Sequence, residues 1–339
     1  MSEVDAERRG WTSRGSDAWQ DFWFRAQPAY TLGAIRIAFG VIAMAWAVSL
    51  LPDLDDFFSS TGVVPRQPIS RYELGVFEIW TGDRAIMVGW AVLMVAAFAM
   101  TLGWHSRLAS LTVFVLILSF EYRCPYIFNS GDGLLRIEAL LLALAPSGAA
   151  LSLDQKRTSG SFWSAQDRAR WPIRLMQVQF SLIYIATFVT RMTGQKWPEG
   201  TALSYAMRLE DMLIAPVPTW ITTNATIMNV ATWGTLVGEL LIGILVWNRR
   251  CRSVVLIAGL VLHGTILITI AVGFFTPAMF LLYLAFVPPD TVRRWVLRAK
   301  DVVAQRLSPR RFEHDAGPER VEHDAVHPEP RQPAELAAE

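Results

Sequence analysis

Ionisable side chains interrupt several of the apolar segments of this chain. A charged side chain inside a lipid-spanning helix is costly, so it normally faces a protein interior or a water-filled cavity and has a function. Carboxylates and a histidine can accept or hold protons there, and guanidinium groups can bind anions in a bidentate fork. The residues concerned are Arg36, Asp132, Arg136, Glu138, Glu239 and His263. The sequence therefore predicts a buried polar site that opens to the outer side of a membrane.

The same charges have a second interpretation, in which they only hold helices together. The ion pairs expected in that case are Arg36 with Glu138 and Arg136 with Glu239. An isolated buried pair adds little stability, and membrane helices can associate through Ser, Thr or Asn contacts instead. We therefore favour a functional site. His263 is the most evenly balanced residue, because a neutral histidine is a common hydrogen-bonding group in helix bundles.

The composition places these residues in a membrane protein. Of the 339 residues, 53% are hydrophobic and only 18% are charged, which is too apolar for an ordinary soluble domain. A span needs about 20 apolar residues. Eight segments are candidates: 30–51, 85–102, 108–120, 133–151, 172–189, 228–247, 253–272 and 274–287. We predict an all-α integral membrane protein, a polytopic bundle of about eight transmembrane helices.

Basic residues predict the orientation of the bundle. Lys and Arg are in excess in the loops that lie on the same side as the two termini, and the positive-inside rule places that side in the cytoplasm. We expect residues 1–27 to form a polar cytoplasmic N-terminus, residues 28–290 to form the transmembrane domain, and residues 291–339 to form a basic and then disordered cytoplasmic tail.

Two outward loops are long enough to hold short interfacial helices. In the first, Ser70 and Glu73 form a capping-box signature, and an apolar face follows as far as Trp80. In the second, a helix is expected over residues 201–214, ended by Pro216. These helices are either a lid over a site that opens outward or simple amphipathic connectors.

Other patterns predict no further chemistry. The spacing of His and Cys matches no metal site, and Cys124 and Cys251 fall on opposite sides of the membrane, which excludes a disulfide within one chain. The small residues Gly234 and Gly238 form a GxxxG pattern, which we attribute to packing inside the bundle and which leaves the oligomeric state open. The net charge of +1 gives no indication of a nucleic-acid partner.

An ordered series of motifs extends over most of residues 28–290. The series consists of NSGDGLLR at 129–136, SLD at 152–154, IYIATFVTRMTGQKWPEGTALSY at 183–205, Glu239, and His263 followed by GFF at 273–275. It resembles the HTTM family, named for a horizontally transferred transmembrane domain, and specifically the membrane domain of vitamin K-dependent gamma-carboxylase. The usual hosts of the family imply a bacterial inner membrane.

The resemblance also defines what this chain lacks. In the carboxylase, a lysine deprotonates a reduced quinone, which reacts with oxygen to give the base that activates a peptide glutamate. Alignment on WPEG at 197–200 places Arg191 at that lysine position. Arginine stays protonated above pH 12 and cannot be a general base. A carboxylase histidine is replaced at or near Asp132, whereas His263 matches a family histidine. We therefore do not expect glutamate carboxylation.

Two functions remain in view, and the sequence leaves open whether the protein is catalytic. The first is quinone-linked redox or group-transfer chemistry with a reduced, vitamin K-like quinone as the implied cofactor. Its candidate proton-handling residues are Asp132, Glu239 and His263, and its candidate substrate-binding residues are Arg136, Arg191, Trp197 and Glu199. The alternative is a non-catalytic membrane factor for the maturation or export of a secreted peptide. Expected partners are membrane lipid, a quinone, and a secreted peptide or membrane protein.

Overall fold

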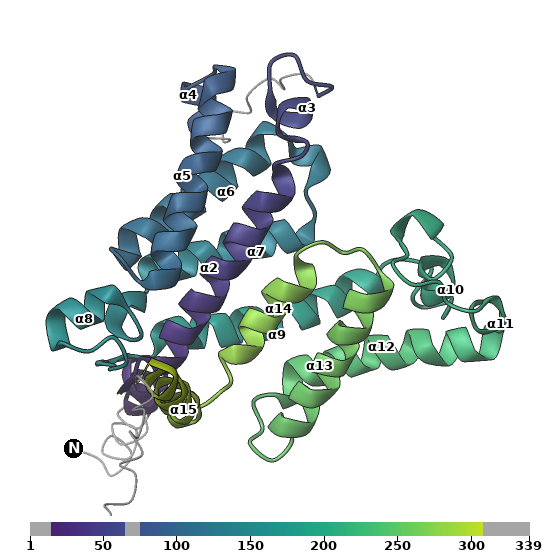
Figure 1. The fold of residues 1–339 in the computed structure, drawn as a ribbon. Helices are drawn as coiled ribbons and strands as arrows, with labels where there is room; N and C mark the ends of the chain where they lie inside the picture. Colours follow the sequence, from purple (N-terminus) through teal and green to yellow (C-terminus); the bar gives the residue numbers. More distant parts are fainter. Residues whose placement is uncertain (1–14, 65–74, 308–339) are drawn as a thin grey trace, which may run out of the picture. The chain divides into compact units, whose positions relative to one another are not determined.

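The computed structural model describes residues 15–64 and 75–307. The chain divides into two compact units, Met1–Lys300 and Asp301–Glu339, and the helices discussed below belong to the first, except that the last one begins in the first and ends in the second. Its described part is mainly helical (Figure 1), with one two-stranded antiparallel sheet of β1 (Ala26–Pro28) and β2 (Asp167–Ala169). The prediction of an all-α membrane protein is thus confirmed at the level of helical content.

Four long helices follow one another in the first half of the unit. They are α2 (Tyr30–Leu50), α5 (Asp83–Leu102), α6 (Ser106–Arg123) and α7 (Ser130–Leu144). Each packs against the next, from α2 to α5, α6 and α7. Helix α6 is longer than the predicted segment, and α7 is shorter because the chain turns at Pro146 into a short 3-10 helix, η2 (Ser147–Ala149).

A second group of four helices follows, and one of them lies at the centre of the unit. These are α9 (Trp171–Met192), α12 (Ala225–Leu245), α13 (Arg252–Thr269) and α14 (Phe275–Leu284). Helix α14 contacts α2, α7, α9 and α13, and Figure 1 shows it between the two groups. Most of its side chains are buried, among them Met279 and Leu282. A helix of only 10 residues can therefore be stable here because protein, not lipid, surrounds it.

Five described helices are long and apolar enough to cross a membrane, namely α2, α5, α9, α12 and α13. A sixth span results if α14 and α15 (Pro289–Leu307), which are bent by 105°, count as one. The predicted segments at α6 and α7 do form helices, but α6 carries charges near both ends and α7 has 15 residues. The chain is a multi-pass membrane protein by these criteria, with fewer long spans than the eight predicted.

The two loops that were expected to face outward differ from their predicted form. In the first, Ser70 and Glu73 lie outside the described residues, which resume before α4 (Val76–Ile79); α3 (Leu54–Phe58) precedes the gap. The continuous helix predicted over 201–214 is wrong. That stretch instead contains α10 (Ala202–Ala206) and the 3-10 helix η3 (Glu210–Met212), and α11 (Thr219–Thr222) follows.

The reason for the break in the second loop is a backbone contact with the end of α13. Leu213 is extended and forms a bridge with Ile270. The Ile214 N–H donates to the Thr269 carbonyl at 3.0 Å, and the Ala271 N–H donates to the Met212 carbonyl at 2.8 Å. An extended residue cannot continue a helix, so this pairing ends the helical stretch and ties the loop to the bundle.

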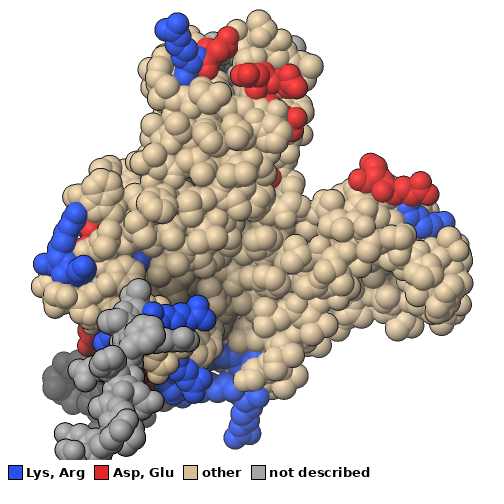
Figure 2. Space-filling model, viewed as in Figure 1, with Lys and Arg blue, Asp and Glu red and all other residues tan. Residues whose placement is uncertain are grey.

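Basic and acidic side chains are distributed unevenly over the unit. Figure 2 shows Lys and Arg around α8 (Leu153–Ser159) and at the lower end, where the turn between α12 and α13 lies, and it shows most Asp and Glu near α3 and α10, with a few basic residues beside them. We call these the basic end and the acidic end. The basic end carries Lys156, Arg157, Arg249 and Arg250, and the acidic end carries Asp53, Asp55, Asp56, Glu210 and Asp211.

The structure also bears on the expected C-terminal tail and on the GxxxG pattern. Helix α15 continues past Lys300 to Leu307, so the chain is helical further than its composition suggested, and the rest of the expected tail, 308–339, lies outside the described residues. In α12, a Cβ atom added to Gly234 or Gly238 would meet nothing within 4 Å. The GxxxG pattern therefore does not pack against another described helix of this chain.

Candidate functional site

A cavity of about 830 Å³ lies among α7, α9, α12 and α13. The loop 197–212 and residues 269–275, both at the acidic end, complete its wall. Most of the wall is apolar, with Ile183, Leu262 and Ile266 as examples. Arg136, Arg191, Glu239 and Trp197 also line it. The four residues were all predicted from the sequence, although they come from three helices and one loop.

An ion pair crosses the cavity wall between α9 and α12. Arg191 Nη1 donates to Glu239 Oε2, and the Arg191 guanidinium lies 4.0 Å from the centre of the Trp197 ring. The Glu239 side chain is 6% exposed and that of Arg191 is 26% exposed. Arg191 is thus fixed by a carboxylate and by an aromatic face, and it still reaches the cavity.

A second ion pair joins α7 to α6. Arg136 Nη1 donates to Glu121 Oε2, whose side chain is 7% exposed. The predicted pairing of Arg136 with Glu239 is therefore wrong, because each of these residues has a different and closer partner. Sequence reasoning missed Glu121 because the apolar segment was taken to end at Phe120, one residue before it.

Arg36 holds the turn that follows α7. Its Nη1 donates to the carbonyl oxygens of Ser147 at 2.8 Å and Ala150 at 3.1 Å, and its Nη2 donates to that of Leu151. Since Leu151 has a positive φ of 51°, the guanidinium stabilises a strained stretch of backbone at the basic end. The predicted pair with Glu138 is wrong; Glu138 is buried, and neither carboxylate oxygen has a hydrogen-bond partner among the described residues.

Asp132 caps a helix and does not line the cavity. It is the third residue of α7 and accepts the Asn129 backbone N–H at 2.7 Å, while the Asn129 side chain accepts the Gly131 N–H at 2.7 Å. The other carboxylate oxygen of Asp132 accepts the Trp46 indole N–H at 2.7 Å. A Cβ on Gly131 would lie 2.4 Å from the Phe275 nitrogen, so glycine lets the starts of α7 and α14 approach. The NSGD sequence is explained by this capping box.

His263 lies behind the cavity wall in a chain of hydrogen bonds. Its Nε2 is 2.7 Å from the Tyr184 hydroxyl, which is 2.7 Å from the Tyr283 hydroxyl. His263 is 2% exposed, and its Nδ1 has no partner among the described residues. Its ring lies 5.8 Å from that of Phe275, which does line the cavity. Such a chain can hold or relay a proton, but a side-chain movement is needed to connect it to the cavity.

The remaining predicted residue, Glu199, is outside the wall. Its backbone carbonyl accepts the Asn229 side-chain N–H at 3.2 Å, which ties the loop to α12. Tyr184 and Tyr283 were not predicted, because no motif in the sequence links them to His263. Among the described residues, no group of three or more His, Cys, Asp or Glu side chains could hold a metal ion.

The family comparison agrees with this description of the fold. The model of the family described as HTTM domain matches residues 24–291, which include every helix from α2 to α14 and the whole cavity. Comparisons with curated proteins and with solved structures gave no match.

Proposed function

Because this chain belongs to the HTTM domain family, we propose that its cavity binds a lipophilic molecule with a polar head, of the class of reduced quinones. The observation that carries the proposal is the Arg191–Glu239 pair in the otherwise mainly apolar wall of a cavity of about 830 Å³. Small-molecule sites are typically apolar cavities of about 300–1,000 Å³ with a few polar groups that fix the orientation of the ligand.

The residues present fit a quinone. Arg136 and Arg191 can each donate a hydrogen bond to an oxygen on the ring, since each guanidinium has five N–H donors and uses one Nη on its carboxylate. Apolar side chains such as Ile183 and Leu262 suit the ring and an isoprenoid tail. A bound quinone would supply two-electron redox chemistry, and the arginines would hold its oxygens.

The cation at position 191 determines which chemistry this site supports. Arg191 can stabilise an anionic head group but cannot remove a proton from it. Glu239 is the carboxylate in the wall of the cavity, and Arg191 donates a hydrogen bond to it. The proposal is therefore binding and electrostatic stabilisation of a quinone-like anion, without glutamate carboxylation.

The orientation of the protein is part of the same proposal. The basic end faces the cytoplasm under the positive-inside rule, in a bacterial cytoplasmic membrane. The cavity, which is lined by the loop 197–212 and by residues 269–275, then opens towards the outer side.

A ligand-binding experiment tests this function. Menaquinone-4 is titrated into the detergent-purified protein, and the bound fraction is read by native mass spectrometry. We expect one molecule per chain and a loss of affinity of about 10-fold or more in R191Q, because a hydrogen bond to a charged group contributes about 1.5–3 kcal/mol. The matched control is R208Q, since Arg208 is an exposed cation of the same loop that does not line the cavity.

Two results would overturn the proposal. One is binding of menaquinone-4 that is no tighter than that of phosphatidylcholine, and the other is equal binding by the unmodified protein, R191Q and R208Q. A secreted peptide that copurifies in the absence of quinone would favour the alternative, a non-catalytic maturation or export factor.

A further inference from the structure

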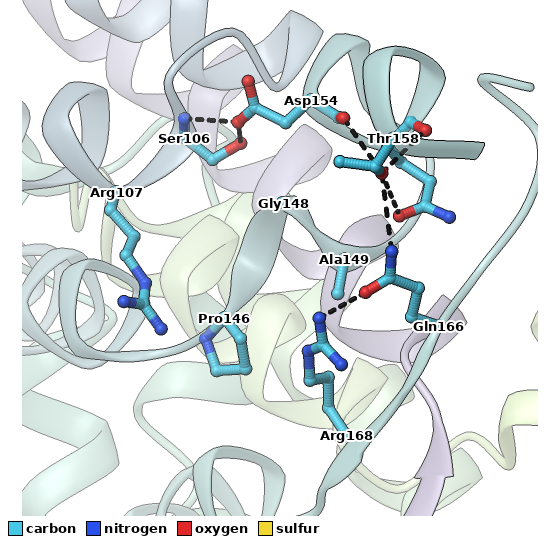
Figure 3. Close-up of a pocket in the computed structure, with 10 residues that line it drawn as sticks. Ser106, Arg107, Pro146, Gly148, Ala149, Asp154, Thr158, Gln166 and Arg168 are labelled. Atoms are coloured by element: carbon cyan, nitrogen blue, oxygen red, sulfur yellow. Dashed lines mark hydrogen bonds between the residues drawn. The ribbon is translucent and has the colours of Figure 1, made fainter. Parts of the chain in front are cut away.

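A second, smaller pocket of about 260 Å³ lies at the basic end (Figure 3). It is formed by the start of α6, the turn after α7, helix α8 and strand β2. None of its lining residues lines the cavity described above. Pro146 and Ala149 give it an apolar part, and the remaining residues are mainly polar or charged.

The start of α6 does not itself attract an anion to this pocket, because it already has one. Asp154 accepts the backbone N–H groups of His105 at 2.9 Å and Ser106 at 2.8 Å, and the Ser106 hydroxyl at 2.7 Å. Burial raises the pKa of Asp154, but these hydrogen bonds outweigh burial and hold it below its usual value of 3.8. The carboxylate is ionised and its oxygens are turned to the helix.

Two arginines supply the positive charge of the pocket. Figure 3 shows Arg107 and Arg168 on either side of Pro146, and both residues are exposed. Arg168 donates to the Gln166 side chain, which in turn donates to Thr158 at 3.4 Å. Within the described part of the chain, the Arg107 side chain makes no hydrogen bond or ion pair. Its planar fork of N–H donors is available to a ligand.

The pocket lies beside the turn that joins α5 to α6. Helix α5 ends at Leu102 and α6 begins at Ser106. Between them Trp104 is 45% exposed, and Trp163 is half-buried in the neighbouring loop. Exposed tryptophans at helix ends are typical of the head-group level of a membrane.

From the two arginines and this position we propose that the pocket binds the phosphate group of an anionic phospholipid. Guanidinium groups recognise phosphate oxygens in a bidentate fork, and basic pockets between helices are known sites for lipid head groups. Lys156 and Arg157 lie nearby on α8, where Arg157 pairs with Asp154 at 3.7 Å and Lys156 adds positive charge. That charge disfavours the ammonium group of phosphatidylcholine, so the site prefers phosphatidylglycerol.

The test is a lipid titration of the full-length protein in detergent, read by native mass spectrometry. Phosphatidylglycerol and phosphatidylcholine with the same acyl chains are compared on the unmodified protein, on R107Q and on the R107Q/R168Q variant. A basic side chain near a membrane surface contributes about 1 kcal/mol, which is about five-fold in affinity. We expect a loss of about five-fold in R107Q and about 30-fold in the double variant, for phosphatidylglycerol only.

The matched control is R250Q, because Arg250 is an exposed cation of the basic end in the turn between α12 and α13, outside the pocket. An affinity for phosphatidylglycerol within two-fold of the unmodified value is expected there. Equal affinity for the two lipids, or a loss in R250Q as large as in R107Q, would overturn the proposal. Competition by soluble glycerol phosphate at the affinity of the lipid would overturn the assignment to a lipid.

Discussion

The Arg191–Glu239 pair allows a quantitative test of how this cavity is built. In R191Q, Glu239 loses its hydrogen-bonded cation while its side chain remains 6% exposed. Breaking a buried ion pair from one side costs about 3–5 kcal/mol. In E239Q, Arg191 keeps its contact with the Trp197 ring at 4.0 Å, and its side chain is 26% exposed. We therefore expect a smaller loss, of about 2 kcal/mol in the free energy of unfolding. The loss of arginine should therefore be the more damaging change.

The double variant R191Q/E239Q completes the cycle. With both charges removed, no uncompensated ion remains and the two amides can form a hydrogen bond with each other. We expect it to be less destabilised than R191Q alone, with a coupling energy of about 2–3 kcal/mol. The free energies of unfolding are measured by reversible denaturation in mixed micelles, with the tryptophan fluorescence of the purified variants as the signal.

A control separates the ion pair from the stacking interaction. W197L removes the aromatic face but leaves Glu239 paired, and it should cost about 1 kcal/mol. If the two single effects of R191Q and E239Q add to within about 0.5 kcal/mol of the double variant, the two side chains do not interact in the folded protein. The reasoning about the cavity wall would then be refuted.

Three further predictions concern other parts of the fold. D132N should lower the free energy of unfolding in chemical denaturation by about 1–3 kcal/mol. The two oxygens of the carboxylate accept one N–H group each, whereas the amide has one oxygen and would point its own N–H donor at the second N–H group. The pKa of Asp154 is lowered in the folded protein, so its contribution to stability is present above its unfolded pKa of about 4 and is lost as the pH falls through the folded pKa. D154N should lower the free energy of unfolding by about 1 kcal/mol at pH 7, and below about pH 4 its melting temperature should depend less on pH than that of the unmodified protein. G259A should cost about 1–3 kcal/mol, since its Cβ would lie 1.8 Å from the Tyr283 hydroxyl, whereas G264A, which meets nothing within 4 Å, should be neutral or slightly stabilising in the same thermal assay.

The helices could be predicted because apolar composition over about 20 residues is a local property. All eight predicted segments contain a helix, including the short α14. What a single sequence does not contain is the surroundings of each helix. Helix α14 is enclosed by four other helices. An apolar run of 10 residues can therefore be a helix buried within the protein, whereas a run of about 20 indicates a helix that crosses the membrane. Eight spans are therefore not confirmed: α14 has 10 residues, α7 has 15, and α6 carries charges near both ends.

Four of the residues that line the cavity were predicted from the sequence, and their role in a functional site stays a prediction. Charges in apolar segments mark a polar interior, and this rule found Arg136 and Glu239; the resemblance to the family added Arg191 and Trp197. The rule cannot assign partners, because pairing depends on which helix faces touch. Arg136 bonds to Glu121 on α6, and Arg36 bonds to backbone carbonyls that have no sequence signature. Asp132 was also given a chemical role, and the structure places it in a helix cap.

The arrangement around the cavity favours a site that stabilises charge over one that abstracts protons. The acceptor in its wall, Glu239, is bonded to Arg191, and the His263 Nε2 behind the wall is bonded to Tyr184. A ligand that approaches Arg191 meets a guanidinium that Glu239 and the Trp197 ring hold in place. It can deliver a proton to neither Glu239 nor His263 unless an existing hydrogen bond first breaks. Tight binding of an anion that weakens with added salt, with little dependence on pH between 6 and 8, is the behaviour that this geometry supports.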